Sequence, residues 1–491
     1  MSSLKHYASN KNITVFFIFL TAIYSLPIFF TGRLYIDDLG RTLYGYTGWG
    51  ANGRPLSDLI MQTMSFGGLL LDLSPLNQLI GLSLLFLALF FYAERNLKGV
   101  SQAEKLTAVF LFIANPFYIE NLSYKFDCLP MSLSIVMLLI PFTMNEDGFL
   151  KKVFSVLFVI ASLSLYQASI GLFIILTLLD IVGKNNQAGN RLILLYTFKR
   201  ILQLILAYVL YKFFIASSFV KDEYNIIHSE VIPFSLDSIE IIKKNATEII
   251  WFLRSYVDTI PLFMKVIFSL AIIYSIYKSF IELWIIDRKR HCFAMFITLL
   301  SPVLVLAFAI APLLLLKQPV FAPRVLLSLS GLMMFYSYIT MKKINQLPIK
   351  IVLYAPLIWL CMVYSYSYSN ASISQERMDT LISSSIYQDI SHSGRDFNYV
   401  NVLGQMPKSQ QLVIAESKLP LMSRLVPVYL SYDWIWGAEL LNHYGLNLKY
   451  KVIGDERDSL MCKGDFISKG NLYSLYYYKD IVFIDFKNKK C

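Results

Sequence analysis

The chain has 491 residues, of which 56% are apolar and 15% aromatic, and it carries a formal net charge of +11. This composition is too apolar for a soluble protein of this length and indicates a polytopic membrane protein. The charge does not indicate a nucleic-acid-binding surface, because residues 370–491 hold 14 Lys and Arg against 13 Asp and Glu. Nearly all of the positive excess therefore lies among the apolar runs, where it sets orientation in the membrane.

Apolar runs approach the length of about 20 residues that crosses a hydrocarbon core as a helix, and they recur as far as residue 369. We predict about eleven transmembrane helices, at residues 13–30, 76–92, 106–118, 129–144, 153–165, 169–182, 201–219, 262–285, 293–316, 325–341 and 351–368. The first run is interpreted as an uncleaved span, since no small-residue cleavage site follows it. Lys and Arg gather in alternate loops, beginning with Lys5 and Lys11, which predicts a cytoplasmic N-terminus. The external loops are then 31–75, 117–128, 218–261 and 317–324.

The predicted fold is thus a polytopic α-helical membrane domain, residues 1–369, followed by a small C-terminal extramembrane α/β domain, residues 370–491. The C-terminal domain contains a predicted helix at 372–390, a helix-compatible stretch at 436–444 and one or two strands at 473–486. Eleven spans place this domain outside the cytoplasm. In an oxidising compartment Cys462 and Cys491 can form a disulfide, the alternative being two unpaired thiols. None of the five cysteines has a CxxC spacing, so no zinc site is indicated.

Paired carboxylates follow the first span directly. The loop after residue 30 contains Asp37, Asp38, Arg41, Arg54 and Asp58. An ordinary interfacial loop explains its Tyr and Trp residues, but it explains two adjacent acids less well, because charge held at the mouth of a membrane bundle is costly unless it is used or paired. We predict that Asp37 and Asp38 are catalytic; the competing interpretation is that Asp38 caps a short helix and pairs with Arg41.

Other external segments add polar residues that we predict to bind substrate. Lys125 and Asp127 lie in the second external loop, Tyr166 and Gln167 in a tight turn between two spans, and Arg324 after the ninth span. The competing interpretations are a surface ion pair for Lys125 and Asp127, a simple turn for Tyr166 and Gln167, and an anchor of the tenth span for Arg324. Few charges lie in mid-span, where a transporter places them, so the pattern favours a site at the external membrane boundary.

Such a site suits transfer of a sugar from a polyprenyl phosphate. A carboxylate removes the proton from the acceptor hydroxyl as that hydroxyl attacks the anomeric carbon, and Arg or Lys stabilises the departing phosphate. Direct attack predicts inversion at this carbon. No nucleotide is required, and the sequence contains neither a P-loop nor a GxGxxG motif. The paired acids leave the use of a divalent cation open.

Three segments carry a resemblance to a known family. They are Tyr35-Ile36-Asp37-Asp38-Leu39-Gly40-Arg41, the Gly53-to-Leu56 turn, and the stretch from Asn115-Pro116-Phe117 to Lys125-Phe126-Asp127. The chain resembles the GtrII-type serotype-converting O-antigen glucosyltransferases, which belong to the GT-C class of polytopic glycosyltransferases. The resemblance is specific over about the first 170 residues and rests on architecture beyond them.

The resemblance implies transfer of glucose from undecaprenyl-phosphate-glucose to O-antigen lipopolysaccharide at the periplasmic face of a bacterial inner membrane. It also implies a functional link to a small flippase and to a cytoplasmic glucosyltransferase that loads the lipid. Asp37, Asp38 and Asp127 match the acidic positions expected in the external loops. The alternatives that remain are another polyprenyl-phosphate-sugar-dependent GT-C transferase and a polysaccharide or lipid transporter; an acyltransferase ranks below both, because no span contains a His that such an enzyme would use.

Overall fold

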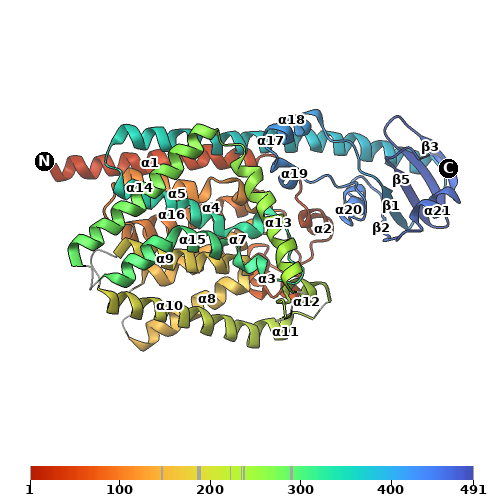
Figure 1. Cartoon of the computed structure of the whole chain (residues 1–491). Helices are drawn as coiled ribbons and strands as arrows, with labels where there is room; N and C mark the ends of the chain where they lie inside the picture. The colour runs from red at the N-terminus through yellow and green to blue at the C-terminus, as the bar shows by residue number, and fades with distance from the viewer. Residues whose placement is uncertain are drawn as a thin grey trace. The chain divides into compact units, whose positions relative to one another are not determined.

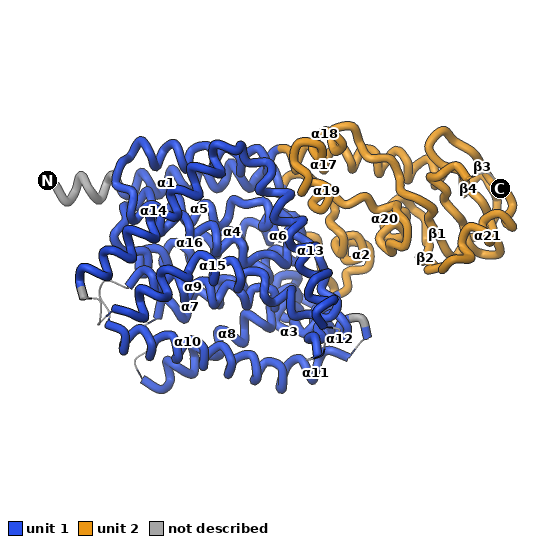
Figure 2. Tube along the Cα trace, in the orientation of Figure 1, with its two compact units in different colours: residues 1–29, 47–68, 73–366 blue, residues 30–46, 69–72, 367–491 orange. Residues whose placement is uncertain are grey.

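The computed structural model describes residues 2–144, 148–184, 189–221, 223–233, 235, 238–287, 291–489 and 491. Positions 222, 234, 236 and 237 of the expected external loop 218–261 lie outside the described residues. The chain divides into two compact units (Figure 2). Unit 1 comprises residues 1–29, 47–68 and 73–366, and unit 2 comprises residues 30–46, 69–72 and 367–491. The first predicted external loop is therefore shared between the two units, with 30–46 in unit 2 and 47–68 in unit 1.

Unit 1 is helical (Figure 1). Its elements are α1 (Ser2–Phe29), η1 (Gly50–Asn52), α3 (Pro55–Met64), α4 (Leu76–Asn96), α5 (Gln102–Ile113), α6 (Pro116–Ser123), α7 (Cys128–Thr143), α8 (Phe149–Leu165), η2 (Gln167–Ser169), α9 (Ile170–Lys184), α10 (Asn190–Leu210), the π-helical turn η3 (Tyr211–Ala216), α11 (Ser217–Phe219), α12 (Glu223–Ser229), α13 (Ser238–Val257), α14 (Leu262–Asp287), α15 (Cys292–Leu314), η4 (Pro323–Leu326), α16 (Ser328–Lys343) and the first part of α17 (Leu347–His392). Each of the eleven apolar runs corresponds to a helix or a helix pair.

Seven helices within the described residues are long and apolar enough to cross a membrane, or eight if the bent pair α5 and α6 is one span. This shows a multi-pass helical protein, and the finer count of eleven spans stays a prediction. The difference arises because some apolar helices are short: α7 has only 16 residues.

The bend between α5 and α6 is 63° and follows from local sequence. Ser101 and Glu104 form a capping box that starts α5. Asn115 then caps α6, accepting the backbone N–H of Phe117 at 3.1 Å, with Pro116 at the first helical position. The apolar run 106–118, which we predict as one span, is thus divided at Asn115 into two helices.

The core of unit 1 is made by helix-on-helix packing. α4 packs on α7 and α7 on α8, while α5 packs on α16 and α9 on α15. α4 and α7 approach closely because position 81 has no side chain: a Cβ on Gly81 would lie 3.1 Å from the hydroxyl of Ser132. Helix α13 is fixed to the end of α15 by buried Asn245, whose amide donates to the carbonyl of Leu316 at 2.8 Å.

Helix α17 runs for 46 residues and joins two elements that the sequence predicts separately, the span 351–368 and the helix 372–390. The boundary between the units, at residues 366 and 367, falls inside this helix.

Unit 2 combines short helices with one sheet. Its elements are α2 (Asp37–Tyr44), the second part of α17, β1 (Tyr399–Leu403), α18 (Gln410–Lys418), α19 (Met422–Leu425), α20 (Trp436–Asn442), β2 (Lys449–Tyr450), α21 (Arg457–Cys462), β3 (Asp465–Lys469), β4 (Ser474–Tyr478) and β5 (Ile481–Asp485). The strand order is β2-β1-β5-β4-β3, with β1 parallel to β2 and β5 and the other pairs antiparallel. The predicted strand region 473–486 is thus a hairpin of two strands.

Candidate functional site

The loop before α3 is shaped by one carboxylate. Asp58, in the first turn of α3, accepts the backbone N–H groups of Gly48, Trp49 and Gly50 at 2.9, 3.1 and 2.5 Å. An acid at this position also complements the positive end of the helix. Both oxygens of Asp58 are therefore engaged by the loop backbone, and the side chain fixes the position of Trp49.

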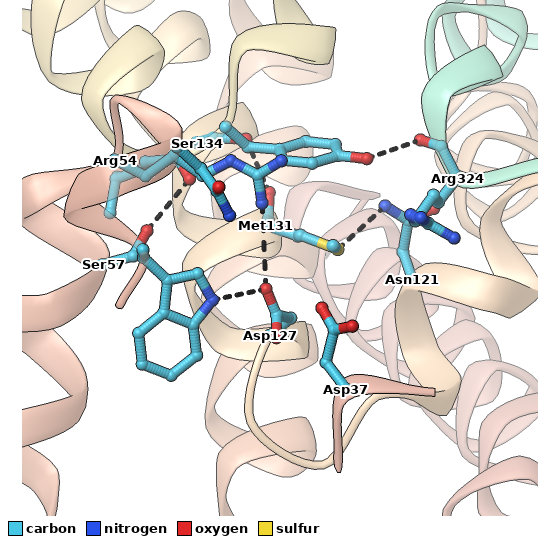
Figure 3. A network of polar contacts seen from close by, with 12 residues as sticks. Asp37, Arg54, Ser57, Asn121, Asp127, Met131, Ser134 and Arg324 are labelled. Atoms are coloured by element: carbon cyan, nitrogen blue, oxygen red, sulfur yellow. Dashed lines mark hydrogen bonds and ion pairs between the residues drawn. The ribbon is translucent and has the colours of Figure 1, made fainter. Parts of the chain in front are cut away.

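Asp127 lies in a polar network in unit 1 (Figure 3), where its partner is Trp49. Both side chains are buried, and the indole Nε1 donates to Oδ1 of Asp127 at 2.6 Å. The same oxygen lies 3.8 Å from Nη1 of Arg54. The interpretation as a surface ion pair requires an exposed Asp127, but this side chain is buried. It accepts a hydrogen bond from Trp49 and lies close to Arg54.

Arg54 is held on several sides. Its Nε donates to Oε1 of Gln167 at 3.1 Å, and its guanidinium carbon lies 4.6 Å from the ring centroid of Tyr166. Nη2 makes no hydrogen bond within the described part of the chain. The side chain remains 22% exposed, whereas the Asp127 side chain is 4% exposed. This arrangement orients a cation whose outward N–H groups are available to an anion.

Gln167 continues the network to Tyr211. Its Nε2 donates to the carbonyl of Asn52 at 2.7 Å and to the hydroxyl of Tyr211 at 2.8 Å, and that hydroxyl donates to the carbonyl of Gly53 at 3.0 Å. Gly53 has φ +73°, and a Cβ there would lie 2.5 Å from the Tyr211 hydroxyl. The Gly53 turn therefore requires glycine both for its backbone conformation and for this close approach.

Arg324 is oriented by a second buried acid, Glu120 of α6. One Glu120 oxygen accepts the backbone N–H of Arg324 at 2.8 Å and the other pairs with its guanidinium. The hydroxyl of Tyr166 donates to the carbonyl of Arg324 at 3.3 Å. Burial raises the pKa of Tyr166 to about 12, although Arg324 and Arg54 act to lower it, so this phenol stays protonated near neutral pH. Tyr166 thus connects the Arg54 and Arg324 parts of the network.

The acid pair predicted to be catalytic lies in unit 2, on α2. Asp38 is fully buried and its Oδ2 accepts the backbone N–H of Tyr35 at 3.3 Å. The Asp37 side chain is 38% exposed and lies 3.5 Å from the buried Arg41, one turn along the helix. Asp37 and Arg41 therefore form an ion pair within α2.

The remaining predicted residues are placed as follows. Lys125 is half-buried, and its carbonyl accepts a hydrogen bond from Asn77 at 3.1 Å. Cys462 and Cys491 form a disulfide in unit 2. Among the residues that the structure describes, no group of three or more His, Cys, Asp or Glu is arranged to hold a metal ion.

Sequence reasoning missed Glu120, Trp49 and Tyr211 as members of the network. Trp49 was assigned to an interfacial aromatic belt, and Tyr211 lies inside an apolar run with no motif around it. Glu120 lies inside the recognised segment 115–127, but its partner Arg324 is 204 residues away. A pairing over such a distance leaves no local signal in a single sequence.

Comparison with known proteins identifies the family. The model of the glucosyl transferase GtrII family matches residues 26–335. The chain belongs to the GtrII family. A GtrII family member is a glucosyltransferase, and hence a glycosyltransferase enzyme. The matched region contains α2, with Asp37 and Asp38, and the whole Arg54–Arg324 network.

The GtrII chain is also 30% identical over 467 residues to a protein of Salmonella phage P22 described as an uncharacterized 55.3 kDa protein in the gtrB 5′ region. The alignment covers 91% of this chain and 93% of the phage protein. No solved structure matches the chain.

Proposed function

We propose that this GtrII family member transfers glucose from undecaprenyl-phosphate-glucose to O-antigen lipopolysaccharide at the periplasmic face of a bacterial inner membrane. The observation that carries the proposal is the family match over residues 26–335, which includes both the acid pair and the arginine network. The donor is loaded by a cytoplasmic glucosyltransferase and brought across the membrane by a small flippase, as the family resemblance implies.

The Arg54–Arg324 network is assigned to the phosphate of the donor. Both guanidiniums are partly exposed, at 22% and 21% of their side chains, and each is oriented by a buried acid. As the bond between the sugar and the phosphate breaks, negative charge grows on the phosphate oxygens. Cations already fixed in place stabilise that charge without reorganising, which lowers the barrier.

The general base is assigned to Asp37. A base has to reach the acceptor hydroxyl, and of the two adjacent acids only Asp37 has an exposed carboxylate, since Asp38 is fully buried. Asp37 takes the proton while the acceptor oxygen attacks the anomeric carbon and the phosphate leaves, so the configuration at this carbon is inverted. Asp38 is assigned to holding the start of α2 through its bond to the Tyr35 N–H.

The periplasmic assignment is supported by the Cys462–Cys491 disulfide, because disulfides persist in oxidising compartments. The distribution of Lys and Arg in the loops supports the same orientation, with the N-terminus in the cytoplasm.

The test is transfer of labelled glucose from undecaprenyl-phosphate-glucose to O-antigen lipopolysaccharide in membranes containing the chain. Asp37→Asn should lower transfer by about a hundredfold or more, because the base is lost. Asp38→Asn keeps the shape of the side chain and should lower glucose transfer mainly to the extent that it lowers the amount of folded protein. Asp465→Asn, at an exposed carboxylate on β3, is the matched control.

Full transfer by Asp37→Asn at matched expression would remove Asp37 as the base. Movement of the substrate across the membrane without a new glycosidic bond, in the wild type, would contradict the enzyme and favour a transporter. Activity with another lipid-linked sugar only would replace glucose as the donor sugar.

A further inference from the structure

Unit 2 contains an exposed aromatic loop whose position in the sheet is well defined. Residues 431–436 read Ser-Tyr-Asp-Trp-Ile-Trp. The loop is fixed beside the end of β1, because Tyr432 N–H donates to the carbonyl of Gly404 and Met406 N–H to the carbonyl of Leu430, both at 2.8 Å. β1 is parallel to its neighbours β2 and β5, so the loop lies at the carboxyl edge of these strands. Ligands of parallel sheets commonly bind at this edge.

The ring of Tyr432 is supported from one side by a buried cation. The guanidinium carbon of Arg457 lies 3.8 Å from the ring centroid, and Arg457 is only 2% exposed. Its Nη2 donates to the carbonyl of Ile453 at 2.6 Å and pairs with the carboxylate of Asp433. Nε and Nη1 of Arg457 are buried and without a hydrogen-bond partner in the described part of the chain. The ring face of Tyr432 therefore serves as a main partner of this guanidinium, while Tyr432 itself is 54% exposed.

Asp433, which lies between Tyr432 and Trp434 in the sequence, is held in an unusual backbone conformation. Its φ of +52° lies in the left-handed region, which residues other than glycine rarely adopt. Arg457 pairs with Oδ1 only, Oδ2 makes no hydrogen bond within the described residues, and the side chain is 36% exposed. The loop thus presents one oriented carboxylate oxygen outward. Strain of this kind is often kept where it positions a functional group.

The ring of the third residue, Trp434, also packs on a neighbouring side chain. It stacks on the ring of Tyr429, with ring centroids 5.5 Å apart and an angle of 24° between the planes. The Tyr429 ring is buried, and its centroid lies 4.8 Å from the guanidinium carbon of Arg33. The loop therefore combines, in three consecutive residues, two aromatic rings packed on neighbouring side chains and one carboxylate. An aromatic face packs against the C–H face of a pyranose, and a carboxylate accepts hydrogen bonds from its hydroxyls.

We propose that Tyr432, Asp433 and Trp434 form a subsite that binds one saccharide unit of the acceptor polysaccharide. The proposal rests on the proposed function, which requires a polysaccharide acceptor, and it adds the residues that recognise this acceptor. The alternative occupant is the lipid surface, which exposed Tyr and Trp residues also contact. The carboxylate of Asp433 disfavours the lipid surface, since a partly exposed acid is costly to place in lipid.

Binding of polysaccharide without any donor tests the subsite directly. The full-length protein in detergent is titrated calorimetrically with a panel of delipidated O-antigen polysaccharides. For the polysaccharide that binds the wild type, Tyr432→Ala should raise Kd by about tenfold, as truncation of an aromatic anchor does. Asp433→Asn should also weaken binding. Tyr432→Phe, in contrast to Tyr432→Ala, should bind with the wild-type Kd because the ring face remains. Phe466→Ala, which removes a 57% exposed ring on β3 of the same unit, should leave Kd unchanged.

Wild-type Kd in both Tyr432→Ala and Asp433→Asn, or no binding of any polysaccharide by the wild type, would overturn the subsite. So would quenching of Trp434 fluorescence by brominated lipid in nanodiscs, assigned by comparison with Trp434→Phe, because the loop would then lie in the lipid. If Tyr432→Ala fails to fold, Asp433→Asn and Tyr432→Phe still decide the question.

The transfer assay separates this proposal from the proposed function. If the wild type transfers glucose and Tyr432→Ala keeps the acceptor KM, the subsite is wrong and the enzyme assignment stands. If the wild type transfers no sugar from any lipid-linked donor yet binds polysaccharide through Tyr432, the proposed transfer reaction is wrong and the subsite stands. A rise in acceptor KM with unchanged donor KM is the result that supports both.

Discussion

Arg54 and Arg324 each have a buried acid behind them, and this determines how they can act. A guanidinium that pairs with Asp127 or Glu120 on its buried side keeps a fixed direction, and its planar fork can meet phosphate oxygens with two N–H groups. A lysine at position 54 would keep the charge but lacks the planar set of N–H donors that contacts Gln167 and Asp127 while facing a phosphate. The network thus depends on the identity of its residues as well as on their charge.

For this reason we expect Arg54→Gln to lower kcat by about a hundredfold, the effect of losing one donor to a developing oxyanion. The kcat of Arg54→Lys should lie between those of the wild type and Arg54→Gln, because lysine keeps the positive charge but lacks the planar fork of N–H groups. Glucose transfer at saturating acceptor measures the change. Arg254→Gln, at an exposed arginine on α13, is the control and should behave as the wild type. Equal activity of Arg54→Gln and the control would contradict the phosphate assignment.

At the scale of elements, the segment 30–46 is packed within unit 2 by one buried ion pair. Arg33 donates to Oδ2 of Asp379 on α17, from Nη2 at 2.8 Å and Nε at 3.1 Å, and also to the carbonyl of Pro427 at 2.5 Å. The hydroxyl of Tyr429 bonds the backbone of the same segment at Leu34 and Ile36. The segment that bears α2 is therefore fixed by long-range contacts.

We expect Asp379→Ala to destabilise unit 2 by about 3–5 kcal/mol, because it leaves Arg33 buried without its partner. Asp465→Ala should cost less than about 1 kcal/mol, since Arg395 and Asp465 are an exposed pair. The two variants are compared by denaturant unfolding, with protease cleavage within residues 30–46 as the readout. The same small loss in both variants would show that the Arg33–Asp379 pair does not hold the segment.

The elements themselves were largely predictable. The long apolar runs located the helices. Contacts between residues that lie far apart in the chain could not be predicted. The pairs Arg33–Asp379 and Glu120–Arg324 are 346 and 204 residues apart, so no spacing rule reveals them.

At the scale of the whole molecule, the two units differ in what stabilises them. Unit 1 is a bundle of apolar helices, whereas unit 2 has a small sheet and a disulfide that closes a sequence separation of 29. Cross-linking of a loop of this size removes conformational freedom from the unfolded chain. The disulfide is therefore expected to matter mainly for unit 2.

We expect the double variant Cys462→Ser/Cys491→Ser to lower the stability of unit 2 by about 2–4 kcal/mol. Cys292→Ser, at an exposed free cysteine of unit 1, is the control and should have little effect. Unfolding of both variants with and without reductant checks this: the reductant should destabilise the wild type and the control but not the double variant. A control that resists reductant would contradict the assignment.

Orientation is the property of the whole chain on which the periplasmic assignment depends, and two exposed positions test it. Phe66, 99% exposed, lies in the expected external loop 31–75, and Phe149, 79% exposed, precedes Lys151 and Lys152 of an expected cytoplasmic loop. In a Cys292→Ser background, the other free cysteines are buried. A membrane-impermeant maleimide should then label Phe66→Cys in cells with a permeabilised outer membrane and label Phe149→Cys only after the inner membrane is disrupted. The reverse pattern would place the acid pair and the arginine network on the cytoplasmic side, where the lipid-linked donor is made rather than used.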